Sequence, residues 1–296
     1  MAREWRRLLV PPERLAAAAG SCDRAGAELA LEPQELHYLR RVLRLRPGQP
    51  FALVDGAGHL WSATLAAGAG TGGDAQQARA LLEQPLQRPL LAEPPPRPAL
   101  QLAVALPRQD ADVLVRMACE LGIDRLSPLH AARSAAAEPL RPQRQAAILR
   151  EALEQCERLW LPRLDPPQDA GPFLGAAPVP LPAPPPPASA GQVLRLLATT
   201  RREGLEPLEQ RLNAAGLAAE LVPTAVPPAL VVVAIGPEGG WSPEEERMAE
   251  AAGWRPVGLG TTILRTSTAA VSAAALLTAW RRGLVLSCGT SRPPSP

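Results

Sequence analysis

One stretch of this 296-residue chain constrains its fold more than any other, and it covers residues 231–280. It opens with the apolar run VVVAI, which predicts a buried strand, and continues into the tight turn GPEGG at residues 236–240. Ser242 suits a helix N-cap, Pro243 the first helical position, and Glu245 the closing position of a capping box. The predicted order is therefore strand, glycine turn and helix.

A second set of the same three parts follows. A short strand is predicted at residues 256–259 and ends in Gly260, a loop covers residues 261–265, and another helix begins with Thr266 or Ser267 as its expected cap. Two glycine loops thus follow two strands, and each loop opens a helix. Because backbone N–H groups are exposed at such points of an open α/β sheet, we expect a ligand-binding site at these loops.

The rest of the chain divides at a proline-rich linker, residues 93–98. Residues 1–93 predict a small β-rich domain, and residues 98–284 predict an α/β domain. In the second domain, strands are predicted at residues 100–106, 125–129, 193–198 and 231–235, and helices at residues 110–121, 141–158 and 205–215. This alternation is typical of a parallel sheet with helices on both faces.

In the first domain, strands are predicted at residues 6–10, 50–54, 59–65 and 78–83, and a short helix begins at residues 32–35. Asp55-Gly56 between two alternating strands is a strong hairpin signal. Residues 68–73 satisfy the pattern GxGxxG, but the strand before them belongs to a hairpin. No acidic residue sits at the later position that a dinucleotide site requires, so we interpret this segment as a turn.

The basic residues of the chain are all arginines, and the net charge is only +2. The strongest local cluster consists of Arg40, Arg41, Arg44 and Arg46, in and just after the short helix of the first domain. Such a cluster either contacts RNA phosphates or forms a solvated helix face. The surrounding small β-rich domain and the neighbouring Tyr38 favour RNA contact.

Further expectations concern segments outside these motifs. Residues 165–190 are rich in proline and predict a surface insert without helix or central strand, and residues 285–296 predict a disordered tail. The four cysteines show no metal-ligand spacing, which favours a reduced, cytoplasmic setting and no metal site. No signal peptide or membrane span is expected, because the apolar helix at residues 269–280 is too short and suits a subunit interface better.

Several segments of the chain match one family in the family's own order. They are HYLRRVLR at residues 37–44, DG at 55–56, MACELGIDRLSPL at 117–129, EALEQCERLWLP at 151–162, IGPEGG at 235–240 and LGTTILRTSTAA at 259–270. Together they resemble the RsmE family, the 16S ribosomal RNA (uracil-N3) methyltransferases of the SPOUT superfamily. The resemblance covers most of the chain except the proline-rich insert and the tail.

The resemblance implies an α/β protein with an N-terminal PUA-like β-barrel and a C-terminal SPOUT α/β domain that contains a trefoil knot. It also implies S-adenosylmethionine as methyl donor, a homodimer, and a uridine in the decoding region of the small ribosomal subunit as target. The chain departs from the family pattern at Ser267, where an acidic residue is usual, at Arg108, where lysine is common, and at Cys156, where serine is common. Ser267 can cap a helix but supplies no carboxylate.

The residues expected to bind the cofactor lie in the two glycine loops. They are Gly236, Pro237, Glu238, Gly239 and Gly240 in the first loop, and Leu259, Gly260, Ile263, Leu264 and Arg265 in the second. Glycine lets the backbone approach a ligand closely, and the three aliphatic side chains can wall an adenine ring. We therefore expect Gly240→Val to abolish cofactor binding in a folded protein.

The chemistry of the reaction suggests two catalytic residues. Uracil N3 carries a proton at neutral pH, so a group must remove this proton or stabilise the anion. Arg265 is the first choice for holding the uracil or its developing negative charge. Glu238 is a candidate base, although it can equally bond backbone groups or oppose Arg265.

Two alternatives to this function stay open. One is a SPOUT methyltransferase that acts on transfer RNA or another ribosomal site, and the other is a catalytically inactive RNA-binding or ribosome-assembly protein, to which Ser267 points. Nicotinamide and ATP enzymes are disfavoured, because GLGTTI lacks the third glycine of a dinucleotide fingerprint and the chain has no GK[ST] motif.

Overall fold

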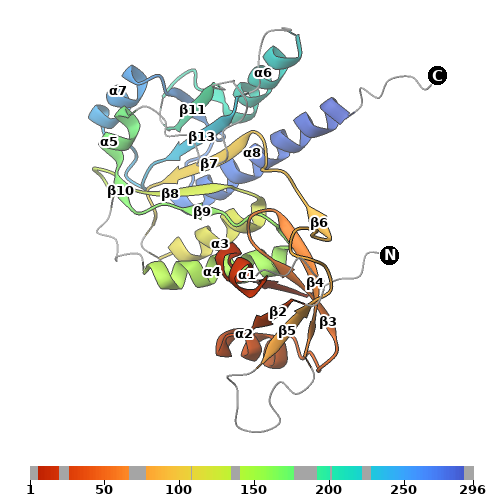
Figure 1. Cartoon of the computed structure of the whole chain (residues 1–296). Helices are drawn as coiled ribbons and strands as arrows, with labels where there is room; N and C mark the ends of the chain where they lie inside the picture. The colour runs from red at the N-terminus through yellow and green to blue at the C-terminus, as the bar shows by residue number, and fades with distance from the viewer. Residues whose placement is uncertain are drawn as a thin grey trace, which may run out of the picture. The chain divides into compact units, whose positions relative to one another are not determined.

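The computed structural model describes residues 6–19, 27–66, 78–107, 109–134, 141–176, 192–200, 202–221 and 228–289. The chain forms two compact units (Figure 1). The first comprises Met1–Pro95 and Arg150–Leu161, and the second comprises Pro96–Leu149 and Pro162–Pro296. The chain leaves the first unit within the proline-rich linker and later returns to it, which the sequence did not predict. The glycine-rich segment 68–73 and Arg108 lie outside the described residues.

The first unit is a six-stranded mixed sheet with short helices. Its elements are β1 (Arg7–Leu9), α1 (Pro12–Ala19), β2 (Glu28–Ala30), α2 (Pro33–His37), the π-helical turn η1 (Tyr38–Val42), β3 (Pro50–Val54), β4 (His59–Leu65), β5 (Arg79–Leu82) and β6 (Leu91–Ala92). The strands pair in the order β1-β3-β4-β5-β2, with β6 also on β4; β1 is parallel to β3 and the other pairs are antiparallel. β3 and β4 have the predicted bounds, whereas α1, β2 and β6 were not predicted.

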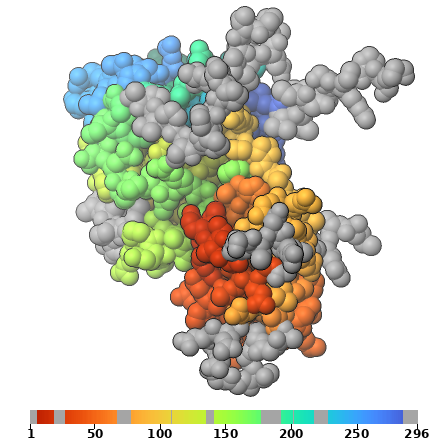
Figure 2. Space-filling model, viewed as in Figure 1, coloured from red at the N-terminus to blue at the C-terminus, as the bar shows by residue number. Residues whose placement is uncertain are grey.

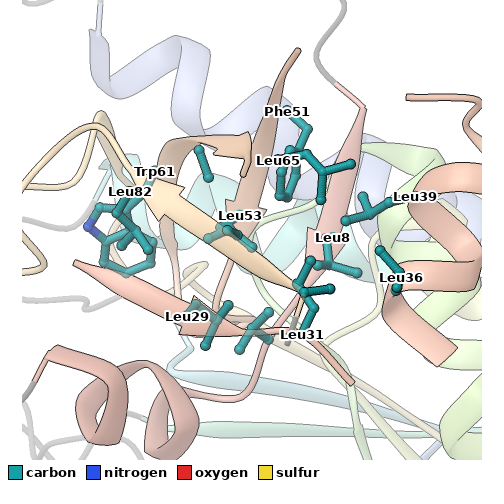
Figure 3. Packing of buried hydrophobic residues seen from close by; sticks show 14 of the residues in the cluster. Leu8, Leu29, Leu31, Leu36, Leu39, Phe51, Leu53, Trp61, Leu65 and Leu82 are labelled. Atoms are coloured by element: carbon teal, nitrogen blue, oxygen red, sulfur yellow. The ribbon is translucent and has the colours of Figure 1, made fainter. Parts of the chain in front are cut away.

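The core of the first unit includes Leu39 of η1, the turn that carries the arginine cluster (Figure 3). Phe51 and Leu53 of β3 and Trp61 and Leu65 of β4 are each at most 4% exposed. Leu39 of η1 packs into the same cluster and is fully buried. Burial of a side chain of this size stabilises the fold by about 1.5–3 kcal/mol. Leu39 therefore fixes η1 to the sheet and keeps its arginines near the surface.

The segment that returns to the first unit binds the hairpin between β3 and β4. Gly58 N donates to Leu159 O at 3.0 Å, and Leu161 N donates to Gly56 O at 2.8 Å. Gly58 has a φ of +100°, and a Cβ there would lie 2.5 Å from the carbonyl oxygen of Glu93. Glycine is thus required by both the backbone conformation and the close packing.

Glu154 is a buried carboxyl group of the first unit and lies near the end of α4 (Pro142–Cys156). Its Oε1 accepts a hydrogen bond from Leu9 N at 2.8 Å. Burial raises the pKa of Glu154 from 4.5 to about 7, although the Leu9 bond and the charge of Arg150 oppose the rise. Between pH 4.5 and 7 the folded protein therefore keeps a proton that the unfolded chain has lost. The contribution of Glu154 to the free energy of unfolding is therefore highest below pH 4.5 and falls as the pH rises from 4.5 to 7.

The second unit contains a parallel sheet, as predicted. Its strands are β7 (Ala99–Val104), β8 (Arg125–His130), β9 (Arg163–Leu164), β10 (Gln168–Asp169), β11 (Val193–Ala198), β12 (Glu206–Pro207), β13 (Leu230–Ile235) and β14 (Arg255–Gly258). The order is β10-β8-β7-β13-β11-β14-β12, with β9 also on β8, and every pair is parallel. The remaining helices are α3 (Ala111–Leu121), α5 (Ala170–Gly175), α6 (Leu208–Leu221), α7 (Pro243–Ala251) and α8 (Thr266–Gly289).

Helices cover both faces of this sheet (Figure 1). Alternate residues of β13, such as Val232 and Ala234, pack in one cluster with Leu174 of α5 and Ala249 of α7. On the other face α8 packs against β7 and β13, and also against α3 and α6. Because successive side chains of a strand point to opposite faces, the continuous apolar sequence of β13 is the pattern expected for a strand buried on both sides.

The predicted proline-rich insert is partly regular, which corrects the expectation for residues 165–190. Residues 168–175 form β10 and α5, and Leu174 is fully buried against α7. Trp254 Nε1 donates to Leu174 O at 2.8 Å. Pro172 is tolerated because it lies in the first turn of α5, where backbone N–H groups have no helical partner. Figure 2 shows α5 and α7 side by side at the surface of the second unit; residues 177–191 lie outside the described residues.

The start and the end of α8 differ from the prediction. The helix begins at Thr266, and the Arg265 carbonyl accepts from Ala269 N at 2.8 Å, so the expectation that Thr266 or Ser267 caps it is wrong. Both hydroxyls bond other loops instead. The helix continues to Gly289, which includes the start of the predicted tail, and residues 290–296 lie outside the described residues. No helix in the described part of the chain combines the length and the apolarity that crossing a membrane requires.

Candidate active site

A cavity of about 740 Å³ lies at the carboxyl ends of β11, β13 and β14. These strands are direct neighbours in the sheet, so their following loops meet at one edge. The loop after β13 and the loop after β14 are the two that the sequence predicted, and the loop after β11 is a third. A cavity of this size at the carboxyl ends of parallel strands is the usual place for a small-molecule ligand.

The loop after β13 contributes two glycines, a proline and a glutamate to the lining. Gly236, Pro237, Glu238 and Gly240 line the cavity. Gly240 has a φ of +72°, and a Cβ there would meet no protein atom within 4 Å. The glycine is therefore needed for the turn and leaves open space beside it. A Cβ at Gly236, in contrast, would lie 3.0 Å from the Trp241 ring.

Gly239 does not line the cavity, which changes the role expected for it. A Cβ at Gly239 would lie 3.0 Å from the Cβ of Arg133. Arg133 Nη1 donates to Gly239 O at 3.2 Å and to Trp241 O at 3.1 Å. Gly239 thus lets the loop pack against Arg133, which sequence reasoning missed because it lies more than a hundred residues earlier in the chain.

The predicted capping box of α7 is confirmed and fixes the end of the same loop. Ser242 Oγ accepts from Glu245 N at 3.2 Å, and Glu245 Oε2 accepts from Ser242 N at 2.8 Å. The other carboxylate oxygen of Glu245 accepts from Ala132 N at 2.8 Å. A pair of residues that was predicted for helix capping therefore also holds the neighbouring segment that contains Arg133.

The loop after β14 supplies the apolar part of the lining. Leu259, Gly260, Ile263 and Leu264 line the cavity, as predicted, and Ile263 is 65% exposed. Gly260 has a φ of +143°, and a Cβ there would meet no protein atom within 4 Å. Arg265 is exposed and lies just after the lining residues, at the start of α8.

Two hydroxyl groups at the start of α8 fix this loop to other elements. Thr266 Oγ1 donates to Gly236 O at 3.0 Å, which joins the loop after β14 to the loop after β13. Ser267 Oγ donates to Asp110 Oδ2 at 3.2 Å, next to the start of α3. Ser267, which departs from the family pattern, thus contacts a carboxylate from another element.

The third loop, after β11, was not predicted as part of the site. Thr199, Thr200, Gly204 and Leu205 line the cavity, and Gly204 has a φ of +70° with open space beside it. Thr199 Oγ1 donates to a carboxylate oxygen of Glu246 at 2.6 Å. The signal in the sequence was a predicted strand that ends directly before Thr199 and Thr200, with Gly204 later in the same loop. Its relevance depends on β11 lying between β13 and β14, which periodicity alone does not reveal.

Charged side chains complete the lining. Among the described lining residues are the carboxylates of Glu203, Glu209 and Glu238 and the guanidinium of Arg202. Arg202 donates to Glu250, which lies outside the lining. This hydrogen bond raises the pKa of Arg202 and lowers the pKa of Glu250. The described part of the lining therefore carries more negative than positive charge.

Comparison with known proteins decides the family. Residues 93–278 match the model of the RNA methyltransferase domain, and residues 31–70 match the model of the RNA methyltransferase PUA domain. Ribosomal RNA small subunit methyltransferase E of a Synechocystis strain is 35% identical over 279 residues, covering 92% of this chain and 77% of that protein. The chain belongs to the RsmE family of RNA methyltransferases.

Solved structures resemble this RsmE family member in fold. Ribosomal RNA small subunit methyltransferase E from Neisseria gonorrhoeae, bound to S-adenosylmethionine, superposes with a TM-score of 0.67 at 23% identity, covering 93% of this chain and 97% of that one. A probable rRNA-methyltransferase from Porphyromonas gingivalis superposes with a TM-score of 0.68 at 20% identity, covering 94% and 99%. The predicted combination of a PUA-like unit and an α/β methyltransferase unit is thus confirmed.

In this RsmE family member the predicted arginine cluster lies on and after η1. Arg41, Arg44 and Arg46 are exposed, and Arg40 is half-buried. Arg44 has a positive φ of +57°, which ends the helical turn and sets the direction of the chain after it. None of the three exposed arginines forms an ion pair with a carboxylate in the described part of the chain. They are therefore available to an anionic partner.

Proposed function

We propose that this RsmE family member transfers the methyl group of S-adenosylmethionine to N3 of one uridine in the decoding region of 16S rRNA, within the small ribosomal subunit. The observation that carries the proposal is the cavity lined by three glycine-bearing loops at the carboxyl ends of β11, β13 and β14. The Synechocystis relative, named for the small-subunit RNA, supports the target. The Neisseria structure, bound to S-adenosylmethionine, supports the donor.

The cavity fits this donor in size and in chemistry. Gly204, Gly240 and Gly260 have positive φ values, and a side chain at each would project into open space. Backbone groups can therefore approach the ligand at three points. Leu259 and Ile263 offer apolar surface for the adenine ring, and the exposure of Ile263 is explained if a ligand covers it. The cavity volume of about 740 Å³ suits a ligand of this class.

The protein's part in the reaction is to position the uridine and to manage its N3 proton. When bound, the donor supplies a methyl group that is already activated on a sulfonium. Glu238 is exposed and lines the cavity, so we assign it the removal of the N3 proton. Arg265, exposed at the edge of the site, is assigned to hold the uracil and stabilise the negative charge that develops on it. No ion pair joins these two described residues, so neither neutralises the other.

Further parts of the proposal concern the assembly and its location. The arginine cluster of the first unit contacts RNA phosphates, two copies of the chain form a homodimer, and the protein works in the cytoplasm. A trefoil knot threads the last segments of the second unit. The strand order β13-β11-β14 supports this topology. The chain passes across β11 on its way from β13 to β14, and α8 then returns to pack on β7 and β13.

Two measurements test the proposal. Mass spectrometry of 16S rRNA from a strain that lacks this protein should show the loss of one N3-methyluridine, and expression of the chain should restore it. Calorimetry on the purified chain should show binding of S-adenosylmethionine. A retained N3-methyluridine together with a lost modification elsewhere would identify another SPOUT methyltransferase, and absence of donor binding by the folded protein would identify an inactive RNA-binding protein.

A further inference from the structure

The charge of the cavity lining is distributed unevenly. Glu203 and Glu209 come from the segment after β11, and Glu238 comes from the loop after β13. All three side chains are exposed, and none of them forms an ion pair in the described part of the chain. Arg202, the cation of the described lining, is bonded to Glu250 outside it. A cationic ligand in this cavity therefore meets three carboxylates that form no ion pair with another described residue.

The proposed donor and its product differ by one charge. The donor carries a sulfonium, an ammonium and a carboxylate group, and so has a net charge of +1. In the reaction the S–CH₃ bond breaks and the N3–CH₃ bond forms, while the N3 proton leaves to the base. Sulfur keeps the electron pair of the broken bond and becomes a neutral thioether, so the product is a zwitterion with no net charge. The two ligands are otherwise nearly identical in shape and in hydrogen-bonding groups.

We infer that Glu203 and Glu209 make this cavity selective for the cationic donor over the neutral product. The inference rests on the proposed function, because it concerns the same cavity and the same ligand. Each exposed carboxylate contributes about a 1.5- to 5-fold preference for the charged ligand. The selectivity speeds turnover, because a product that binds less well leaves sooner and competes less with fresh donor.

Calorimetry of the full chain tests the inference through the ratio of two dissociation constants. The probes are S-adenosylmethionine and S-adenosylhomocysteine, and the quantity compared is product Kd divided by donor Kd. In the double variant Glu203→Gln and Glu209→Gln this ratio should fall about 2- to 25-fold relative to the unchanged protein, because the two contributions multiply. Glu238 stays unchanged in this test, since it is assigned to the reaction itself.

Two further variants test the direction in which the ratio of product Kd to donor Kd changes. Arg202→Gln removes the cation from the lining and should raise the ratio, whereas Glu250→Gln releases Arg202 from its partner and should lower it. Glu244→Gln is the matched control: Glu244 is exposed and paired with Arg247 on the nearby α7, and it does not line the cavity. Its ratio should equal that of the unchanged protein. Raising the salt from about 0.05 to about 0.5 M should reduce all of these shifts, because the Debye length shortens.

The outcomes separate this inference from the function on which it rests. If the folded protein binds neither ligand, the proposed function fails and the selectivity fails with it. If both ligands bind and the double variant changes the ratio by less than about 1.5-fold, the function stands and the selectivity is overturned. A shift for Arg202→Gln in the same direction as for the double variant would also overturn it.

Discussion

Substitution of Gly240 separates an effect on ligand binding from an effect on folding. Its φ of +72° is a conformation in which valine costs roughly 1–3 kcal/mol. The reduced freedom of the unfolded chain offsets about 0.4–1 kcal/mol of this cost. The net loss of stability in Gly240→Val is therefore up to about 2.6 kcal/mol, which lowers the Tm of a unit of this size by up to roughly 10 °C. The variant stays folded at 25 °C, although it is less stable than the unchanged protein.

Gly253 provides a matched control for the strain. It follows α7 and has a φ of +88°, and a Cβ there would also meet no protein atom within 4 Å. It does not line the cavity. Gly253→Val should therefore lose about the same stability as Gly240→Val, and differential scanning fluorimetry measures both losses on the same scale.

Donor affinity distinguishes the two variants. In Gly240→Val the added side chain competes with the ligand for space, at a cost of about 1–3 kcal/mol, so the Kd measured by calorimetry rises about 5- to 150-fold. In Gly253→Val the Kd stays within about twofold of the original value. Equal Kd values in the two variants would refute the assignment of Gly240 to the donor site. A fall in Tm confined to one variant would refute the argument from backbone strain.

Three other predictions follow from the site and the first unit. Arg265→Ala should lower turnover on small ribosomal subunits about 100-fold, as loss of a charge-stabilising hydrogen-bond donor does, while the Kd of S-adenosylmethionine from calorimetry stays within about threefold. Near-normal turnover would remove Arg265 from the mechanism. Arg133→Ala removes the two hydrogen bonds to the loop after β13, so it should cost about 1–2 kcal/mol of stability and weaken donor binding. Arg133→Lys should restore part of the stability and part of the binding. Unchanged donor binding in Arg133→Ala would contradict a positioning role for Arg133. In Glu154→Gln the free energy of unfolding, measured with denaturant, should lose up to about 3 kcal/mol of its pH dependence between pH 4.5 and 7. The reason is that glutamine accepts the hydrogen bond from Leu9 N without titrating. If the free energy of unfolding of this variant still falls over the range, another group causes the pH dependence.

The parts of the fold that follow from local patterns could be predicted from the sequence. β3, β4 and β11 have the predicted bounds, because alternating or continuous apolar runs end at clear turn signals such as Asp55-Gly56. The capping box of Ser242 and Glu245 was also predicted, since both partners lie within one helical turn. All of the predicted cofactor residues except Gly239 and Arg265 line the cavity.

The parts that depend on distant contacts could not be predicted in this way. The loop after β11 joins the site only because β11 lies between β13 and β14, and no local signal gives that order. Arg133 and the return of residues 150–161 to the first unit likewise depend on packing between remote segments. The regular part of the proline-rich insert was missed because proline content was given more weight than the apolar residues Phe173 and Leu174 of α5.

The hydrogen bond from Thr266 to the carbonyl of Gly236 has a consequence for the order in which the protein matures. All described residues that line the cavity lie between Ala198 and Ala269, and this bond joins them to the start of α8. A growing polypeptide therefore completes its donor site only after α8 has been synthesised, and we expect a premature stop before α8 to leave a chain with weakened donor binding.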